Sequence, residues 1–155
     1  MKVQLIAIGD NEEGWLSAGF RTYEQRLTHY LSFETILIPS PKNKTKTREA
    51  ILEGEANLIL KKIPPADYLI LLDSGGREFG SEDLALHISK LFNMPGKKIV
   101  FLLGGAYGFA PAIYERAQMK LSLSRLTFNH QLARLVFLEQ LYRAMTILKG
   151  EKYHH

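Results

Sequence analysis

The stretch of sequence that decides the fold is KIVFLLGGAYGF, residues 98–109. Its first half, 98–103, is apolar after the opening lysine and passes without a break into Gly104, Gly105 and Gly108. An unbroken apolar strand is typical of parallel sheets that are covered on both faces. Glycines directly after such a strand let the main chain turn and approach a ligand closely. The stretch therefore predicts a buried parallel strand that ends in a ligand-binding loop.

The rest of the chain alternates between strand and helix patterns. Short apolar or β-branched runs predict further strands at 3–8, 33–38, 68–73 and 120–123. Apolar residues at three- and four-residue spacing predict helices at 15–31, 47–62, 112–117 and 131–148, and a shorter helix that Ser81 is expected to cap. This alternation predicts an α/β fold, a mainly parallel sheet with helices on both faces and a ligand crevice at the strand carboxyl ends.

Composition narrows the class of protein. The 155 residues, 46% of them hydrophobic, suit a single domain that spans 1–155. There is no cysteine, which excludes a disulfide scaffold and a thiol nucleophile. No apolar stretch approaches the roughly 20 residues of a membrane span and no export signal is visible, so we expect a cytoplasmic protein without membrane contact. The five histidines lack metal-ligand spacing, and no metal is expected.

Three loops that follow predicted strands are candidates for one shared pocket. They are DSGGR at 73–77, GGAYGF at 104–109 and LSRLTFNHQ at 123–131. Neither glycine loop has the Lys-Ser/Thr ending of a phosphate loop or the spacing of a dinucleotide fingerprint, so nothing demands ATP or NAD. The alternative is that the glycines only turn the chain.

A resemblance is carried by the strand ending in Leu72 and Asp73, by FLLGGAYGF, and by the C-terminal run LSLSRLTFNHQLARLVFLEQLYRAMTILKGEKYHH. Together with the opening MKVQLIAIGD, these resemble the RlmH family of SPOUT-superfamily methyltransferases over essentially the whole chain. The resemblance implies S-adenosylmethionine-dependent methylation of N3 of a pseudouridine in 23S ribosomal RNA on the assembled ribosome. It also implies a C-terminal trefoil knot, a rare exception to the rule against threaded loops. It further implies a homodimer in which the C-terminal tail helps to complete a neighbouring active site.

The same resemblance assigns site residues. The cofactor-binding residues it implies are Leu72, Gly104, Leu123, Ser124, Arg125, Leu126, Thr127 and Phe128. Catalytic candidates, which would take the N3 proton or stabilise the resulting charge, are His154, Tyr153, Arg143 and His130. Each has a structural alternative: His130 as a helix cap, Arg143 paired with Glu139, and the terminal residues frayed.

One departure from the family is Asn129, which stands where relatives commonly have proline. The change removes a ring that fixes φ and restores a backbone donor.

Basic residues offer candidate phosphate contacts for an RNA partner. They are Lys42, Lys44, Lys46, Arg77, Arg125 and Arg134. The formal net charge of +4 is too small to hold naked RNA tightly, which agrees with a ribosome as the substrate. Two other functions stay open: a non-catalytic RNA-binding or ribosome-associated module with the same fold, and a nucleotide enzyme that uses the glycine loops for a dinucleotide.

Overall fold

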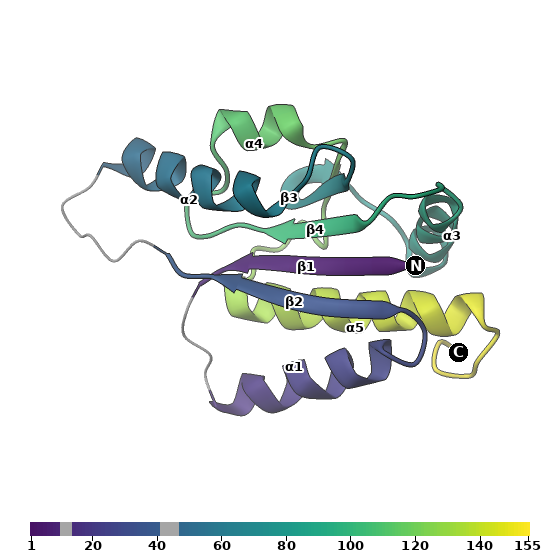
Figure 1. Ribbon diagram of the computed structural model, residues 1–155. Helices are drawn as coiled ribbons and strands as arrows, with labels where there is room; N and C mark the ends of the chain where they lie inside the picture. The colour runs from purple at the N-terminus through teal and green to yellow at the C-terminus, as the bar shows by residue number, and fades with distance from the viewer. Residues whose placement is uncertain (10–13, 41–46) are drawn as a thin grey trace.

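The computed structural model describes residues 1–9, 14–40 and 47–155, and Figure 1 shows their strands and helices alternating along the chain. In chain order the elements are β1 (Lys2–Ile8), α1 (Gly14–Leu27), β2 (Ser32–Ile38), α2 (Arg48–Lys62), β3 (Tyr68–Arg77), α3 (Ser81–Phe92), β4 (Ile99–Leu103), α4 (Pro111–Arg116), β5 (Met119–Leu121) and α5 (His130–Leu148). The predicted order of strands and helices is confirmed.

The five strands form one parallel sheet in the order β2-β1-β4-β3-β5. Parallel strands place all their carboxyl ends at the same edge of the sheet. Because β4, β3 and β5 are neighbours, the three loops singled out in the sequence leave this edge side by side. The predicted α/β fold with helices on both faces is confirmed, and the trefoil knot stays a prediction.

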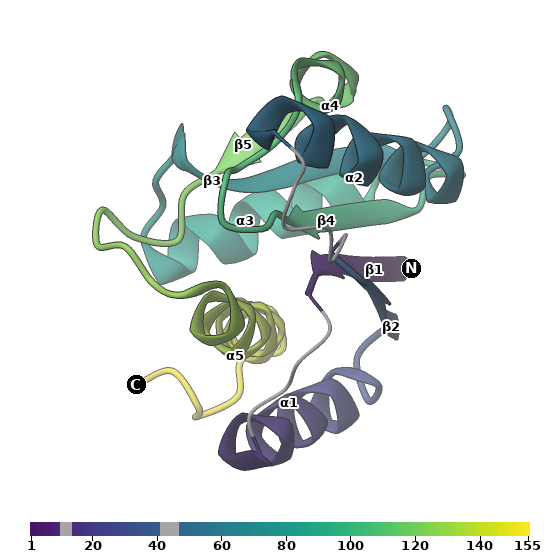
Figure 2. The same ribbon diagram turned by 90° about the vertical axis from the view of Figure 1, so that its left-hand side faces the viewer.

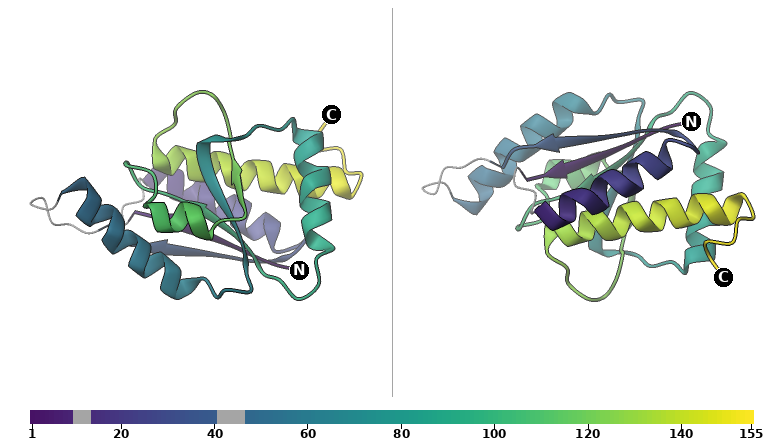
Figure 3. Two further views of the ribbon diagram at one scale, coloured as in Figure 1. Left: turned by 90° about the horizontal axis from the view of Figure 1, so that it is seen from above. Right: turned by 90° about the horizontal axis from the view of Figure 1, so that it is seen from below.

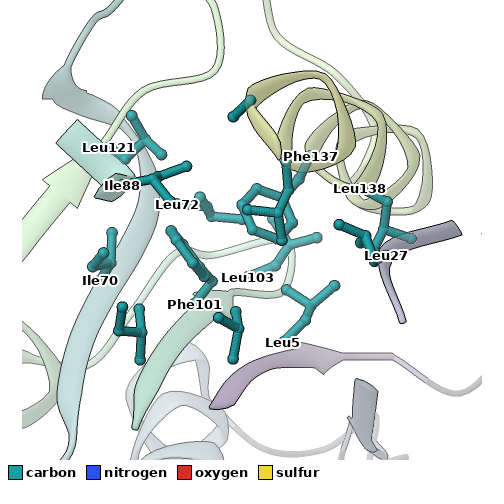
Figure 4. Packing of buried hydrophobic residues seen from close by; sticks show 14 of the residues in the cluster. Leu5, Leu27, Ile70, Leu72, Ile88, Phe101, Leu103, Leu121, Phe137 and Leu138 are labelled. Carbon is teal, nitrogen blue, oxygen red and sulfur yellow. The ribbon is translucent and has the colours of Figure 1, made fainter. Parts of the chain in front are cut away.

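Successive strand residues alternate between two apolar cores, one on each face of the sheet. Leu5 and Phe101 face the core shared with α1, α3 and α5, whereas Ile6 and Leu102 face the core shared with α2 and α4. Figure 2 shows α1 and α5 on one side of the sheet and α2 and α4 on the other. Figure 4 shows Phe137 of α5 directed at Phe101, and their ring centroids are 4.7 Å apart. The period of two thus fixes which strand side chains face each helix layer.

Local hydrogen bonds set the helix ends. The Thr47 side chain accepts a hydrogen bond from Ala50 N at 3.2 Å and caps α2. The prediction that Ser81 caps α3 is wrong, because Gly80 is the N-cap and Ser81 Oγ donates instead to Gln140 of α5 at 3.2 Å. The first helix ends at Leu27, before the predicted 31, because the next three residues form a turn into β2.

The third strand is longer than predicted because its chain rejoins β5 after a short excursion. Leu72 pairs with Leu121, the ladder then shifts, and Arg77 pairs with the same Leu121. Ser122 N donates to Arg77 O at 2.9 Å. A Cβ built on Gly76 would lie 2.6 Å from Leu121 N, so the two main chains are in contact there. This contact fixes where the chain that follows β5 passes the loop that follows β3.

The longest described helix, α5, runs along the sheet beside α1. It begins at the edge where the strands end, and Figure 1 shows the C-terminus at the opposite end of the sheet, near the N-terminus. Figure 3 shows α3 crossing α5 towards its C-terminal end. Neither α5 nor any other helix in the described ranges has both the length and the apolarity that a membrane crossing requires.

Candidate active site

A cavity of about 390 Å³ opens at the edge of the sheet where β3 and β4 end. Its walls come from the middle of β3, where the ladder with β5 shifts, from the loops that follow β4 and β5, and from the first turn of α5. Pockets of this size are typical of small-molecule sites, in which apolar walls surround a few polar groups. The predicted convergence of the three loops on one pocket is confirmed.

Most of the predicted cofactor-binding residues line this cavity: Leu72, Gly104, Leu123, Ser124, Leu126, Thr127 and Phe128. The exception is Arg125, whose side chain is 86% exposed and whose Nε lies 3.0 Å from a carboxylate oxygen of Glu78. The structure therefore turns the guanidinium of Arg125 outward, and only the neighbours of Arg125 in its loop reach the cavity. Leu126 stands at the rim with 74% of its surface exposed.

The glycine loop after β4 is held in a tight turn by its own main chain. Gly108 N donates to Gly105 O at 3.3 Å, and Gly108 has a φ of 75°, a conformation that favours glycine. A Cβ on Gly104 would lie 2.9 Å from Phe109 Cε1 and 3.0 Å from Gly108 O. Glycine at 104 thus lets the loop fold back on itself and present main-chain groups to the cavity.

The loop after β5 is shaped by short side chains. Ser124 Oγ accepts a hydrogen bond from Leu126 N at 2.9 Å, and Ser122 Oγ donates to Ser124 O at 3.1 Å. Asn129 has a φ of −64°, within the range that a proline ring imposes, and its side chain accepts from Leu132 N at 2.8 Å. Asn129, rather than His130, therefore caps α5 and gives the backbone the conformation that the family's proline would impose.

The four predicted catalytic residues do not come together within one chain. His130 lines the cavity at the start of α5, whereas Arg143, Tyr153 and His154 gather near the end of that helix. Thirteen residues of helix separate His130 from Arg143, which corresponds to roughly 20 Å along the axis. Within one chain, the tail cluster therefore lies far from the cavity.

The tail is anchored rather than frayed. Tyr153 Oη donates to Glu139 Oε1 at 3.0 Å and lies 3.2 Å from Tyr23 Oη. Tyr30 Oη donates to Glu151 at 2.6 Å. Burial, and then the bonds to Tyr23 and Glu139, raise the pKa of Tyr153 well above its ordinary value, so its phenol stays protonated. Tyr153 is therefore suited to hold the tail in place and not to accept a proton.

Arg143 links this anchor to His154. Its Nη2 forms the expected pair with Glu139 at 2.7 Å, and this hydrogen bond raises the pKa of the guanidinium. Its Nη1 lies 3.2 Å from His154 Nδ1. Since arginine can only donate, Nδ1 is the acceptor in this pair. The tail thus presents a fixed donor beside an imidazole acceptor.

Sequence reasoning missed an acidic contact at the cavity. Asp73 lines it at the end of β3, and Tyr114 of α4 donates to Asp73 Oδ2 at 2.7 Å. Burial and the bond to Asp73 raise the pKa of Tyr114 to about 12. The two residues are 41 positions apart and follow different strands, so the chain gives no local signal for the pair.

A second acid lies behind the glycine loop. Glu55 of α2 is 5% exposed, and its Oε1 would lie 3.4 Å from a Cβ built on Gly105. Burial raises the pKa of the Glu55 carboxyl above its ordinary 4.5, and the hydrogen bond from Ser40 Oγ at 3.3 Å offsets this only in part.

We expect Glu55→Gln to stabilise the protein more at about pH 8 than at about pH 5. Folded Glu55 holds its proton more tightly than the unfolded chain does, so the wild type loses stability as the pH rises above 4.5. The slope is at most about 1.4 kcal/mol per pH unit for one group. Urea unfolding at both pH values measures it, with the exposed Glu53 changed to glutamine as the control. An equal effect at both pH values would contradict the burial of a charge here.

The basic residues predicted to contact phosphate lie in different surroundings. Lys42, Lys44 and Lys46 lie outside the described residues. Arg77 is exposed, with its guanidinium over the Phe79 ring. The prediction for Arg134 is wrong for this arrangement, because its side chain is 8% exposed and its Nη2 lies 3.3 Å from Glu24 Oε1. Arg134 instead joins α5 to α1.

Comparison with known proteins shows the family to which the chain belongs. The family described as predicted SPOUT methyltransferase matches residues 1–154. The protein named ribosomal RNA large subunit methyltransferase H from Parabacteroides distasonis is 47% identical over 156 residues, which cover 100% of this chain and 99% of that protein. The protein of the same name from Cytophaga hutchinsonii is 47% identical over 155 residues, and the match covers 100% of this chain and 100% of that protein.

Among solved structures, a probable methyltransferase from Bordetella pertussis superposes with a TM-score of 0.59. The match covers 93% of this chain and 96% of that one at 16% identity. At this identity the likeness concerns the fold alone.

Proposed function

The chain belongs to the SPOUT methyltransferase family, and from that premise we propose that it transfers a methyl group from S-adenosylmethionine to N3 of a pseudouridine in large-subunit ribosomal RNA. Its full-length relatives carry the name ribosomal RNA large subunit methyltransferase H, which makes rRNA methylation the activity of this chain. The single observation that supports a cofactor site is the cavity, which residues of all three predicted loops line.

The cavity suits a nucleoside sulfonium. Leu72, Leu103 and Phe128 supply apolar walls for an adenine ring, while the turn at Gly104 and Gly105 supplies main-chain donors and acceptors. When bound, S-adenosylmethionine supplies an electrophilic methyl carbon. The role of the chain is to hold that carbon in line with the acceptor nitrogen, and such positioning is worth roughly 7 to 11 kcal/mol.

The tail suits the acceptor base. The imide edge of a pseudouridine presents a carbonyl oxygen beside the N3 proton. Arg143 Nη1 is a donor, and His154 Nδ1, 3.2 Å away, is an acceptor, so the pair is complementary to that edge. In our proposal Arg143 would donate its hydrogen bond to the carbonyl oxygen, and His154 would take the N3 proton during a transfer in which N3 displaces sulfur from the methyl carbon. Histidine suits this role because its unperturbed pKa is near 6.5.

The partner in this reaction is a second copy of the chain. His130 and the tail cluster lie at opposite ends of α5, so a homodimer that brings one tail to the other cavity unites all the proposed residues. The substrate is the assembled ribosome in the cytoplasm, whose shape positions the target where a net charge of +4 cannot. Arg77, exposed at the end of β3, and Arg125, exposed in the loop that lines the cavity, are the described candidates for a phosphate contact.

Calorimetry with S-adenosylmethionine tests the cofactor site, and we expect the wild type to bind it. Gly104→Ala should weaken binding by about tenfold, because its Cβ would press on Phe109 and on the Gly108 carbonyl. The matched control is Gly14→Ala at the start of α1, which does not line the cavity and whose Cβ has no atom within 4 Å, so it should leave binding close to the wild type. Transfer of a labelled methyl group to ribosomes then separates an enzyme from a non-catalytic module. A wild type that takes up no S-adenosylmethionine would overturn the proposal.

A further inference from the structure

The cavity carries an asymmetry of charge. Among the described residues that line it, the one carboxylate is that of Asp73, and the one side chain able to become cationic is that of His130. The remaining lining residues are apolar, glycine, or neutral polar residues. From the described part of the chain, a ligand in this cavity therefore meets one fixed negative charge, that of Asp73 in β3.

The Asp73 carboxylate is held from two sides. Its Oδ1 accepts from Gly75 N at 2.7 Å, and its Oδ2 accepts from Tyr114 Oη at 2.7 Å. Tyr114 Oη would lie 3.5 Å from a Cβ built on Gly108, another residue of the cavity wall, so the carboxylate lies against the glycine loop. These two hydrogen bonds fix the position of the carboxylate at the cavity wall.

Two described basic residues lie near Tyr114 or follow Asp73 in β3 without lining the cavity. Lys120 Nζ lies 5.7 Å from the centroid of the Tyr114 ring, and the Arg77 guanidinium lies over the Phe79 ring. Neither residue lines the cavity. Glu55, behind the glycine loop, adds no positive charge, and burial raises the pKa of its carboxyl, which favours the protonated form.

From this arrangement we propose that Asp73 makes the cavity selective for a cationic ligand, so that it prefers S-adenosylmethionine over its demethylated product. The inference rests on the proposed cofactor. S-adenosylmethionine carries a sulfonium, an ammonium and a carboxylate, a net charge of +1. The product S-adenosylhomocysteine has lost the sulfonium charge and is neutral overall. Attraction to Asp73 therefore falls when the methyl group leaves, and this favours product release.

Tyr114 is a positioning residue in this proposal. Its hydroxyl fixes Oδ2, and its ring packs against Phe109 with centroids 5.7 Å apart. The charge would remain without this hydroxyl, but only the hydrogen bond from Gly75 N would then hold the carboxylate. The loops after β3 and β4 are thus coupled through one hydrogen bond at the wall that faces the ligand.

Calorimetric titration with both compounds tests the selectivity. Asp73→Asn keeps the size of the side chain and removes the charge; its amide oxygen can still accept from Gly75 N, while its amide nitrogen can donate to Tyr114 Oη in place of the present acceptor. We expect it to weaken binding of S-adenosylmethionine about tenfold and to change binding of S-adenosylhomocysteine by less than about twofold. Tyr114→Phe should lower the ratio of the two affinities by a smaller factor. Glu115→Gln removes the same charge from the exposed face of α4 and should leave both affinities unchanged.

The outcomes are distinguishable. Equal losses for both compounds in Asp73→Asn would overturn the selectivity, because they would mean that Asp73 contacts a part that the two share, such as the ribose hydroxyls. A wild type that binds neither compound would overturn the proposed function instead. If the wild type binds both and the ratio of the affinities is unchanged in Asp73→Asn, only the further inference fails.

Discussion

Heterodimers that carry His154→Ala in one chain and Gly104→Val in the other are expected to keep about half of the wild-type methyl-transfer activity. If each site combines the cavity of one chain with the tail of the other, both changes fall in the same site and the second site stays intact. Each homodimer alone should be nearly inactive. Loss of the base costs roughly 100-fold or more, and a branched side chain at 104 would close on Phe109, which a Cβ already approaches to 2.9 Å.

The experiment contains its own control. Two affinity tags allow heterodimers to be purified, and a second heterodimer carries both changes in one chain opposite a wild-type chain. Shared sites predict that this second species is inactive, since each of its sites then holds one change. Self-sufficient chains predict the reverse, with activity only in the second species. That reversed pattern, or a chain that stays monomeric, would rule out the shared site.

Gly76→Ala is expected to lower the free energy of unfolding by about 3 kcal/mol or more. Its Cβ would lie 2.6 Å from Leu121 N and 2.6 Å from the Lys120 carbonyl carbon, and both of these atoms belong to the main chain. Main chain that is paired in a ladder cannot move aside as the end of a flexible side chain can. The substitution must therefore push β5 away from β3, and with it the loop that lines the cavity.

Urea unfolding at one fixed protein concentration measures the loss, since the dimer we propose would make the apparent stability depend on concentration. Gly14→Ala is the matched control. It is also a glycine-to-alanine change, but a Cβ there has no atom within 4 Å, and the residue opens α1. We expect this control to be neutral or slightly stabilising. Equal midpoints for Gly76→Ala and the wild type would show that the two strands separate without cost.

Much of the fold could be predicted because each element has its own local signal. The run of Ile99 to Leu103 predicts a strand covered on both faces, and it lies fully buried between two layers of helices. Thr47 and Pro111 mark helix starts by chemistry that acts within one turn. The cap expected at Ser81 failed for a reason outside that range, because the serine side chain bonds to a helix 59 residues away.

The site residues also fall into those with a local sequence signal and those whose contacts join distant segments. The residues predicted to line the cavity follow strands directly, and parallel pairing alone brings them to one edge. The Asp73–Tyr114 bond and the burial of Glu55 arise between segments far apart in the chain, which no spacing rule records. The separation of His130 from Arg143 follows from helix geometry once both lie on α5. Which tail meets which cavity depends on a second chain, and one sequence holds no pattern for that.

The cap at Asn129 can be compared with the proline that this family commonly has at the same position. A proline reaches a φ near −65° through its ring, and Asn129 reaches −64° while its side chain satisfies Leu132 N. The proline ring lowers the conformational entropy of the unfolded chain, whereas the asparagine amide adds a capping hydrogen bond to the folded helix. Each residue thus stabilises the folded state by a different mechanism. A proline at 129 would therefore keep the backbone angle of the loop beside the cavity but would leave Leu132 N without its side-chain acceptor.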